Sequence, residues 1–345
     1  MRPIWKGLWK DPVSGLALLW LITLSTTALM AYFIAPVSTE YANEMLPSKA
    51  LVPPGTKTLV YVQRDAERSS WDRFTGGQVQ PVRIHPVADF QKKGVAYDLL
   101  LEGRPDAVGF RIRASEDELQ QRTFWLGTDR YGRDVLSRLI IGARISLSVG
   151  FVAVLISLLI GVPLGAIAGF YGGRVDSFIQ WLLQVVWSIP TLLLVIALTL
   201  ALGKGHWQVF IAIGLTMWVE VARVLRGEVK SQSKREYVDA AVVQGFSSLY
   251  ILRKHVLPNS WAPLIVVSAA NFAAAILMES GLSFLGLGAQ PPVPSWGGMI
   301  RDHYSFILMG KPWLSLAPGI LIMLTVLSFM MIGNRLRDLL DVRNG

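Results

Sequence analysis

The feature that most constrains this chain is a series of apolar runs, each long enough to cross a lipid bilayer. The hydrocarbon core of a membrane is spanned by a helix of about 20 apolar residues. Charged residues make up 17% of the chain, whereas soluble domains carry about a quarter. We therefore predict an all-α polytopic membrane protein with about six transmembrane helices. The predicted spans are Leu16–Ala35, Ile145–Phe170, Phe178–Leu202, Trp207–Val224, Ala262–Leu287 and Trp313–Gly333.

Glycine and proline mark irregular points in these runs. The second run contains Gly161, Gly165 and Gly169, which membrane helices tolerate. Pro190 predicts a kink in the third run because proline cannot donate the helical hydrogen bond. The uncharged stretch Gly281–Gly298 holds three prolines, so we expect a re-entrant or surface loop there.

The distribution of Lys and Arg predicts the orientation of the chain. With the N-terminus in the cytoplasm, the inside segments carry 14 basic residues and the two short outside loops carry three. Cytoplasmic loops are normally the richer in positive charge, which predicts N-in and C-in. The net charge of +9 is then explained by membrane topology, and no nucleic-acid partner is expected. The basic N-terminus before the first run is interpreted as part of a retained helix, although it superficially resembles a signal peptide.

Three regions follow from this pattern. Residues 1–37 hold the N-terminal tail and the first helix, and residues 123–345 hold the remaining helices. Between them, residues 38–122 are polar and contain turn signals. Short alternating stretches such as Thr58–Gln63 and Val108–Arg113 predict strands, so we expect a partly β extracytoplasmic insert between helices 1 and 2.

No residue pattern indicates catalysis or a metal. The chain has no cysteine, and its four histidines (85, 206, 255 and 303) lack metal-binding spacing. A phosphate-binding G-x-x-x-x-G-K-[ST] loop is also missing, so this polypeptide does not bind ATP by that motif. We expect no catalytic residues, no metal and no cofactor on this chain.

The segment 228–258, between the fourth and fifth runs, is the most informative. Glu236–Gln244 has a helical pattern, and the glycine at 245 permits a tight turn. Ser247 can cap a second helix, which Pro258 is predicted to end. Such a segment would form a rigid knob for docking a partner. One face of its first helix is predicted to carry Tyr237, Ala240, Ala241 and Gln244.

This segment resembles the E-A-A-x3-G-x9-I-x-L-P signature of ABC-importer permeases. The match is Asp239-Ala240-Ala241, three residues, Gly245, nine residues, and His255-Val256-Leu257-Pro258. The spacing agrees throughout, with Asp in place of Glu and His in place of Ile. The form "RKHVLPN" is similar to the variant found in the dipeptide/oligopeptide/nickel permease family.

Further blocks resemble the C-type subunits of that family, over roughly 15–35 and 124–345. They are "LGTDRYGRDVLSRLIIGARISL", "GGRVDSFIQWLLQVVWSIPTLLL", "LMESGLSFLGLGAQPPVPSWGGMI" and "GNRLRDLLDVRNG". The resemblance implies a multi-pass permease subunit of a bacterial inner membrane. It would import a dipeptide, an oligopeptide, nickel or another small solute, and the sequence does not decide which.

The resemblance also implies partners. These are a second, B-type permease, two ATPase subunits that hold the ATP, an extracytoplasmic substrate-binding protein, and membrane lipid. The residues implied for coupling to the ATPase are Glu236, Tyr237, Asp239, Ala240, Ala241, Gly245, His255, Leu257 and Pro258. For Tyr237, Ala240 and Ala241 the alternative is a helix face packed on the protein's own spans. For His255 the alternative is a structural hydrogen-bonding residue.

Four other residues are candidates for a pathway or gate. Glu279 lies in the fifth run and could line the pathway or contact the partner permease. Asp129, Arg133 and Asp134 could form an outer gate or a contact for the binding protein, or simply an ion-paired turn before a helix. Glu220 could pair with Arg223 at i, i+3 or face the pathway.

Two other classes of function remain as alternatives. A secondary transporter driven by an ion gradient would favour broken helices in two repeat-related halves. No convincing inverted repeat is seen in the sequence. A membrane enzyme would need an active site in the insert, where His85 stands alone.

Overall fold

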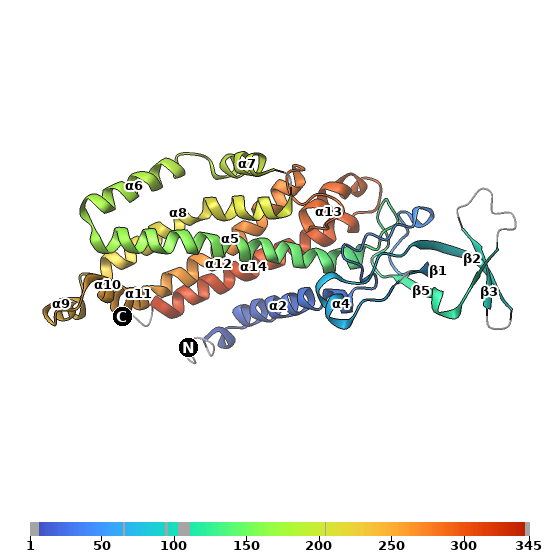
Figure 1. Ribbon diagram of the computed structural model, residues 1–345, viewed down its shortest axis with the longest axis horizontal. Helices are drawn as coiled ribbons and strands as arrows, with labels where there is room; N and C mark the ends of the chain where they lie inside the picture. Colours follow the sequence, from blue (N-terminus) through green and yellow to red (C-terminus); the bar gives the residue numbers. More distant parts are fainter. Residues whose placement is uncertain (1–6, 65, 94–95, 103–110, 204, 342–345) are drawn as a thin grey trace. The chain divides into compact units, whose positions relative to one another are not determined.

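The computed structural model describes residues 7–341, except 65, 94–95, 103–110 and 204. These residues form two compact units, which are described separately. Unit 1 comprises Met1–Thr23, Ser146–Gln290 and Ile320–Gly345, and unit 2 comprises Leu24–Ile145 and Pro291–Gly319. Figure 1 labels the elements along the chain.

The predicted apolar spans are confirmed as helices in the described residues. Five helices are long and apolar enough to cross a membrane, and a sixth span results if one bent pair counts as one. The five are α2 (Pro12–Leu29), α5 (Val135–Tyr171), α8 (His206–Gln232), α12 (Trp261–Phe284) and α14 (Trp313–Asp341). The bent pair is α6 (Gly173–Trp187) and α7 (Thr191–Leu202).

The third predicted run is broken rather than merely kinked. α6 and α7 meet at an angle of 85°. The break falls on residues 188–190, where Pro190 lacks a donor and disfavours helical geometry at Ile189. The first run is also interrupted, because α2 ends at Leu29 and a short helix, α3 (Ala31–Ile34), follows.

The second span begins ten residues earlier than the apolar run predicts, at Val135. Its first turns lie within unit 2 and make protein contacts. The backbone N–H of Val37 donates to Ser137 Oγ at 2.8 Å. These turns can hold polar residues because other protein segments surround the polar side chains.

Within unit 1, α5 packs closely on α8 through glycine. A methyl group at Gly165 would lie 3.0 Å from Cα of Ala222, and one at Gly161 would lie 2.7 Å from the Trp218 carbonyl oxygen. Gly169 faces α8 in the same way. Glycines four residues apart let two membrane helices approach backbone to backbone.

The insert in unit 2 contains an antiparallel sheet, which confirms in part the predicted β character. The strand order is β4-β3-β2-β1-β5. The predicted strand at 58–63 lies within β1, and only residues 111–113 of the other predicted strand fall among the described residues, in β4. The bounds are β1 (Thr56–Gln63), β2 (Arg83–Lys93), β3 (Ala96–Leu101), β4 (Arg111–Ala114) and β5 (Leu119–Phe124), with α4 at Ser70–Gly76, η1 at Pro47–Lys49 and η2 at Glu116–Glu118.

The predicted loop at 281–298 is shorter than expected. α12 continues to Phe284, and α13 (Trp296–His303) begins after a loop at residues 285–295. Ser295 caps α13 by accepting a hydrogen bond from the Gly298 N–H at 3.2 Å. The fully buried Trp296 donates from Nε1 to the Leu139 carbonyl at 3.0 Å. A short helix, η4 (Tyr304–Ile307), follows.

Candidate functional site

The coupling segment predicted from sequence forms a compact helical turn in unit 1, beyond the end of α8 (Figure 1). The chain leaves α8 at Gln232 and enters the eight-residue helix α9. Three short helical pieces then return it to α12. The bounds of all four elements are α9 (Glu236–Val243), α10 (Ser248–Ile251), the π turn η3 (Leu252–Val256) and α11 (Leu257–Asn259).

Local sequence accounts for the turn between α9 and α10. Gly245 has φ +78°, in the left-handed region that favours glycine. Ser247 then caps α10, because its Oγ accepts a hydrogen bond from the Tyr250 N–H at 3.4 Å. The predicted helix, glycine turn and serine cap are all present.

Pro258 does not end the second helix as predicted. It lies at the start of α11, directly after the π turn. A π turn is a local widening of the helix, and such a widening accommodates a residue without an N–H donor. The helical path therefore continues to Asn259, and α12 starts after Ser260.

An apolar cluster fixes this segment to unit 1. Val238 and Ala241 of α9 and Ile251 of α10 are buried with Val221, Leu225 and Val229 of α8. Burying one Val or Leu side chain contributes roughly 1.5–3 kcal/mol. Several such contacts hold α9 firmly against α8.

Two residues of the predicted docking face of α9 point inward instead, towards the protein's own helices. Ala241 is buried in this cluster, and Tyr237 is half-buried against it. The Tyr237 hydroxyl also donates to Gln232 Oε1 at 3.0 Å. These two residues therefore contact the protein's own helices, whereas Ala240 is exposed.

The end of α9, the turn after it and α10 expose apolar side chains that the sequence analysis did not single out. We call this set the exposed apolar patch. Val243 is 88% exposed, and Val242 is 60% exposed. Apolar groups gathered on one surface indicate an interaction site. The patch comprises Val242, Val243, Phe246, Leu249 and Tyr250.

The remaining predicted coupling residues differ in their exposure. Glu236 and Asp239 are exposed on α9, Leu257 packs partly against the apolar cluster, and Pro258 is exposed. The ring of His255 lies 5.8 Å from Tyr250 and 6.2 Å from Phe246, centroid to centroid. Its Nε2 is buried and has no hydrogen-bond partner among the described residues, so the ring acts here by packing.

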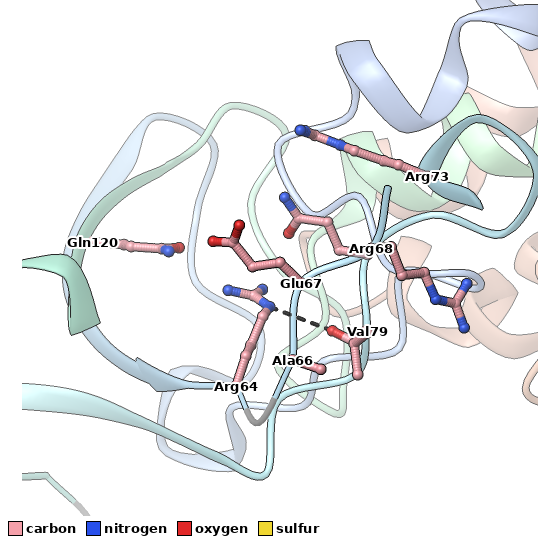
Figure 2. Close-up of a pocket in the computed structure, with 8 residues that line it drawn as sticks. Arg64, Ala66, Glu67, Arg68, Arg73, Val79 and Gln120 are labelled. Atoms are coloured by element: carbon pink, nitrogen blue, oxygen red, sulfur yellow. Dashed lines mark hydrogen bonds between the residues drawn. The ribbon is translucent and has the colours of Figure 1, made fainter. Parts of the chain in front are cut away.

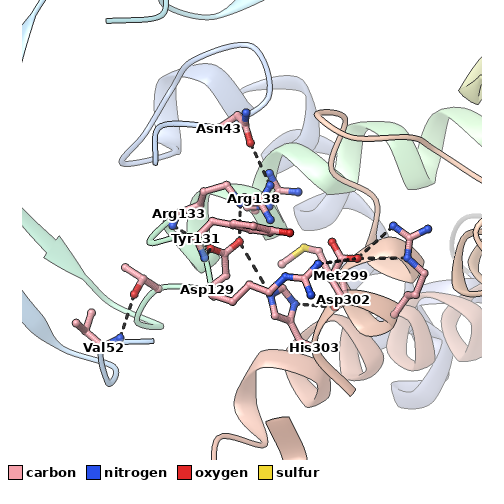
Figure 3. Close-up of polar contacts among 12 residues, drawn as sticks. Asn43, Val52, Asp129, Tyr131, Arg133, Arg138, Met299, Asp302 and His303 are labelled. Atoms are coloured by element: carbon pink, nitrogen blue, oxygen red, sulfur yellow. Dashed lines mark hydrogen bonds and ion pairs between the residues drawn. The ribbon is translucent and has the colours of Figure 1, made fainter. Parts of the chain in front are cut away.

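Asp129 and Arg133 form a closed ion-paired turn in unit 2 (Figure 3). The buried Asp129 carboxylate accepts hydrogen bonds from the backbone N–H of Tyr131 at 2.8 Å and from Arg133 Nε at 2.6 Å. Arg133 Nη1 donates in addition to Asn43 Oδ1 at 3.0 Å. The geometry matches the alternative of an ion-paired turn before a helix, and a gate or contact role stays a prediction.

Two neighbouring groups have shifted pKa values. Burial raises the pKa of Asp134, while hydrogen bonds from Ser137 lower it in part. Burial lowers the pKa of His303, whose Nε2 lies 4.0 Å from Asp129 Oδ2. His303 Nδ1 faces the Met299 carbonyl at 2.8 Å, so a neutral ring can donate to it.

Glu279 is fully buried in α12 within unit 1. Its Oε1 accepts a hydrogen bond from Ser283 Oγ at 2.6 Å, one helical turn further along. A buried carboxylate in a membrane helix is consistent with a role in the pathway, which stays a prediction.

Glu220 and Arg223 form no ion pair in the structure. Glu220 is exposed, and the Arg223 guanidinium lies over the Trp187 ring, with Cζ 3.0 Å from the centroid. The described residues contain no group of three or more His, Cys, Asp or Glu that could hold a metal ion.

Comparison with known proteins gives consistent matches. The family model described as "binding-protein-dependent transport system inner membrane component" matches residues 161–344. The dipeptide transport system permease protein DppC of Alkalihalophilus pseudofirmus is 45% identical over 217 residues, covering 63% of this chain and 71% of the relative. The oligopeptide transport system permease protein OppC of Bacillus subtilis is 39% identical, covering 65% and 73%. OppC of Escherichia coli is also 39% identical, covering 69% and 78%.

Proposed function

Because this chain belongs to the family of inner membrane components of binding-protein-dependent transport systems, we propose that it is one membrane half of an ATP-driven peptide importer. Family membership and the apolar helices show that the chain is a multi-pass permease subunit of the bacterial inner membrane. They also favour this function over an ion-gradient-driven secondary transporter.

The observation that carries the proposal is the exposed apolar patch on the segment that matches the permease signature. Val243 and its neighbours are solvent-facing, while the other side of α9 is fixed in the apolar cluster of unit 1. Such a knob suits docking of a separate ATPase, which would push on α9 when it binds ATP. Glu236 and Asp239 would add charge complementarity at the rim.

The chain's own part in the mechanism is mechanical. Force applied at α9 passes through Val238 and Ala241 to α8, and from α8 through the glycine contacts to α5. In this proposal two separate ATPase subunits hold the ATP, and the present sequence contains no G-x-x-x-x-G-K-[ST] motif of its own. The orientation in this proposal is N-in and C-in, which puts α9 in the cytoplasm.

The proposed cargo is a dipeptide or oligopeptide. This rests on the relatives, which are named as dipeptide and oligopeptide permeases. A second, B-type permease would complete the pathway, with Glu279 as a candidate lining residue. An extracytoplasmic binding protein would deliver the peptide.

Orientation and partner docking can be tested together by labelling one engineered cysteine. The chain has no natural cysteine, so Ser248→Cys in α10 supplies a single thiol. In intact cells we expect an impermeant maleimide to label it only after the membrane is opened. Co-expression with the ATPase subunits of its own transport system should then protect the thiol. Labelling from the outside medium would refute the proposal.

A further inference from the structure

A cavity in the insert, distant in sequence from the coupling segment, has the chemistry of an anion site. It lies in unit 2, has a volume of about 210 Å³, and is lined in part by Arg64, Arg68 and Arg73 (Figure 2). Glu67 is the acidic residue among its lining groups. Residues 38–122 contain twelve basic and twelve acidic residues. The surplus of arginine at the cavity is therefore a local feature and does not reflect the composition of the insert.

The arginines differ in how fully their donors are used. Arg64 donates to Glu44 Oε1 at 2.9 Å and to the Val79 carbonyl at 3.3 Å, and Arg68 donates to the Gly76 carbonyl at 2.9 Å. The Arg73 side chain makes neither a hydrogen bond nor an ion pair with the described part of the chain, and its Nε is buried. A guanidinium group with unused donors suits two-point binding of a phosphate or carboxylate.

Aromatic side chains lie beside Arg73, which belongs to α4 together with Trp71 and Phe74. The Arg73 guanidinium is 5.3 Å from the ring centroid of Phe33, which belongs to α3. Trp71 is 72% exposed and stacks on Phe74 with 5.9 Å between centroids. Phe74 in turn lies 6.4 Å from Phe33. Tryptophan is enriched at the boundary between bilayer and water, so the exposed Trp71 suits that boundary.

The chain path supports this location at a membrane surface. Phe33 follows the first apolar span, which ends at Leu29, and Arg144 immediately precedes the second apolar run. Arg144 Cζ lies 4.4 Å from the Tyr32 ring, and its Nη1 donates to the Phe74 carbonyl at 3.4 Å. The residues that follow the first span thus lie beside the start of the second apolar run within α5, and Phe74 of α4 contacts both.

We propose that this cavity binds an oxyanion of the phosphate class, supplied by a phospholipid headgroup at the extracytoplasmic surface. Arg73 is the principal ligand, Arg68 contributes positive charge, and Trp71 rests in the interfacial layer. Snorkelling arginine and interfacial tryptophan together would hold α4 on the membrane. The inference does not depend on peptide transport, but it takes the N-in and C-in orientation from the proposed function.

Lipid binding by the purified full-length chain tests the proposal. The protein is stripped of lipid in a maltoside detergent, which contains no phosphate, and titrated with dioleoyl phosphatidylglycerol under native mass spectrometry. We expect one tightly held phospholipid per chain. Arg73→Gln should weaken its binding about tenfold, the effect of losing one charge-assisted contact. Arg73→Lys, which keeps the charge but loses the two-point geometry, should give a smaller loss.

Matched controls separate this site from general lipid adhesion. Arg113→Gln removes the same charge from an exposed position on β4 that does not line the cavity, and it should leave binding unchanged. Dioleoylglycerol, which lacks phosphate, should not occupy the site. Inorganic phosphate distinguishes the source of the oxyanion. If it binds as tightly as the lipid, the ligand is a soluble anion and the lipid assignment is wrong. Equal phospholipid binding by wild type, Arg73→Gln and Arg73→Lys would overturn the proposal altogether.

Discussion

Arg226 on α8 holds Asp176 on α6 in a two-point ion pair. Arg226 Nη2 donates to Asp176 Oδ2 at 2.6 Å, while Nε donates to Oδ1. The two side chains are mostly buried, and Lys230 lies 3.8 Å from the same carboxylate. Asp176 lies in the first turn of α6, so this pair fixes the end of α6 that follows α5, opposite the sharp break before α7.

We expect Asp176→Asn to lower the thermal stability of the purified protein. The change removes the negative charge from a hydrogen-bonded pair, which costs about 1.5–3 kcal/mol. The melting temperature in detergent measures the effect. Ser177→Ala, at the next and exposed position, is the matched control and should melt like wild type. An unchanged melting temperature for Asp176→Asn would mean that α6 is held by its apolar contacts alone.

Gly165→Ala should destabilise the packing of α5 on α8. The added methyl group would lie 3.0 Å from Ala222 Cα, so the two helices must separate, at a cost of about 1–3 kcal/mol. Gly227→Ala is the matched control, because a methyl group there meets no atom within 4 Å. We expect the control to be neutral or slightly stabilising, since Ala favours helix over Gly. Comparing the melting temperatures of the two variants checks this, and equal values would contradict the packing argument.

Val243→Asp should abolish binding of the ATPase subunits without unfolding the permease. Val243 is 88% exposed, so an aspartate costs the isolated chain little, but it would put an unpaired charge into a docked apolar interface. The measurement is co-purification with the ATPase. Leu308→Asp, at a residue 93% exposed in unit 2, provides the matched control and should retain the ATPase. Retention by both variants would show that the exposed apolar patch is not the docking surface.

His303 should make the protein less stable below about pH 6.5, the ordinary pKa of histidine. Burial lowers its pKa in the folded state, so the unfolded chain takes up a proton at a higher pH than the folded chain does. Stability conferred by the neutral ring is full above pH 6.5 and is lost as the pH falls towards the folded pKa. His303→Gln should flatten this slope in melting temperatures measured between pH 7.5 and 5. An identical slope in the variant would show that other groups govern the pH dependence.

Local patterns in the sequence were sufficient for the helices and for the turn of the coupling segment. Apolar runs of about 20 residues need no tertiary information to be recognised as spans. Gly245 and Ser247 act on their own backbone neighbours, so the predicted turn and cap were confirmed. The π turn before Pro258 was not predicted, because its widening involves the hydrogen bonding of the whole segment.

Tertiary structure decided which side of each element faces inward. Helical periodicity placed Tyr237 and Ala241 on one face of α9 but did not show which element packs on that face. The structure shows that apolar residues of α8 pack there. The same holds for Asp129 and Arg133, whose charges are enclosed by residues far away in sequence such as Asn43.

The sequence by itself determined the class of the protein, its membrane spans and the family to which it belongs. Those depend on composition and short-range spacing, which are properties of consecutive residues. Only the tertiary structure decided that Val242 and Val243 are exposed and that Arg73 adjoins Phe33, because burial and charge neutralisation depend on segments that meet after folding.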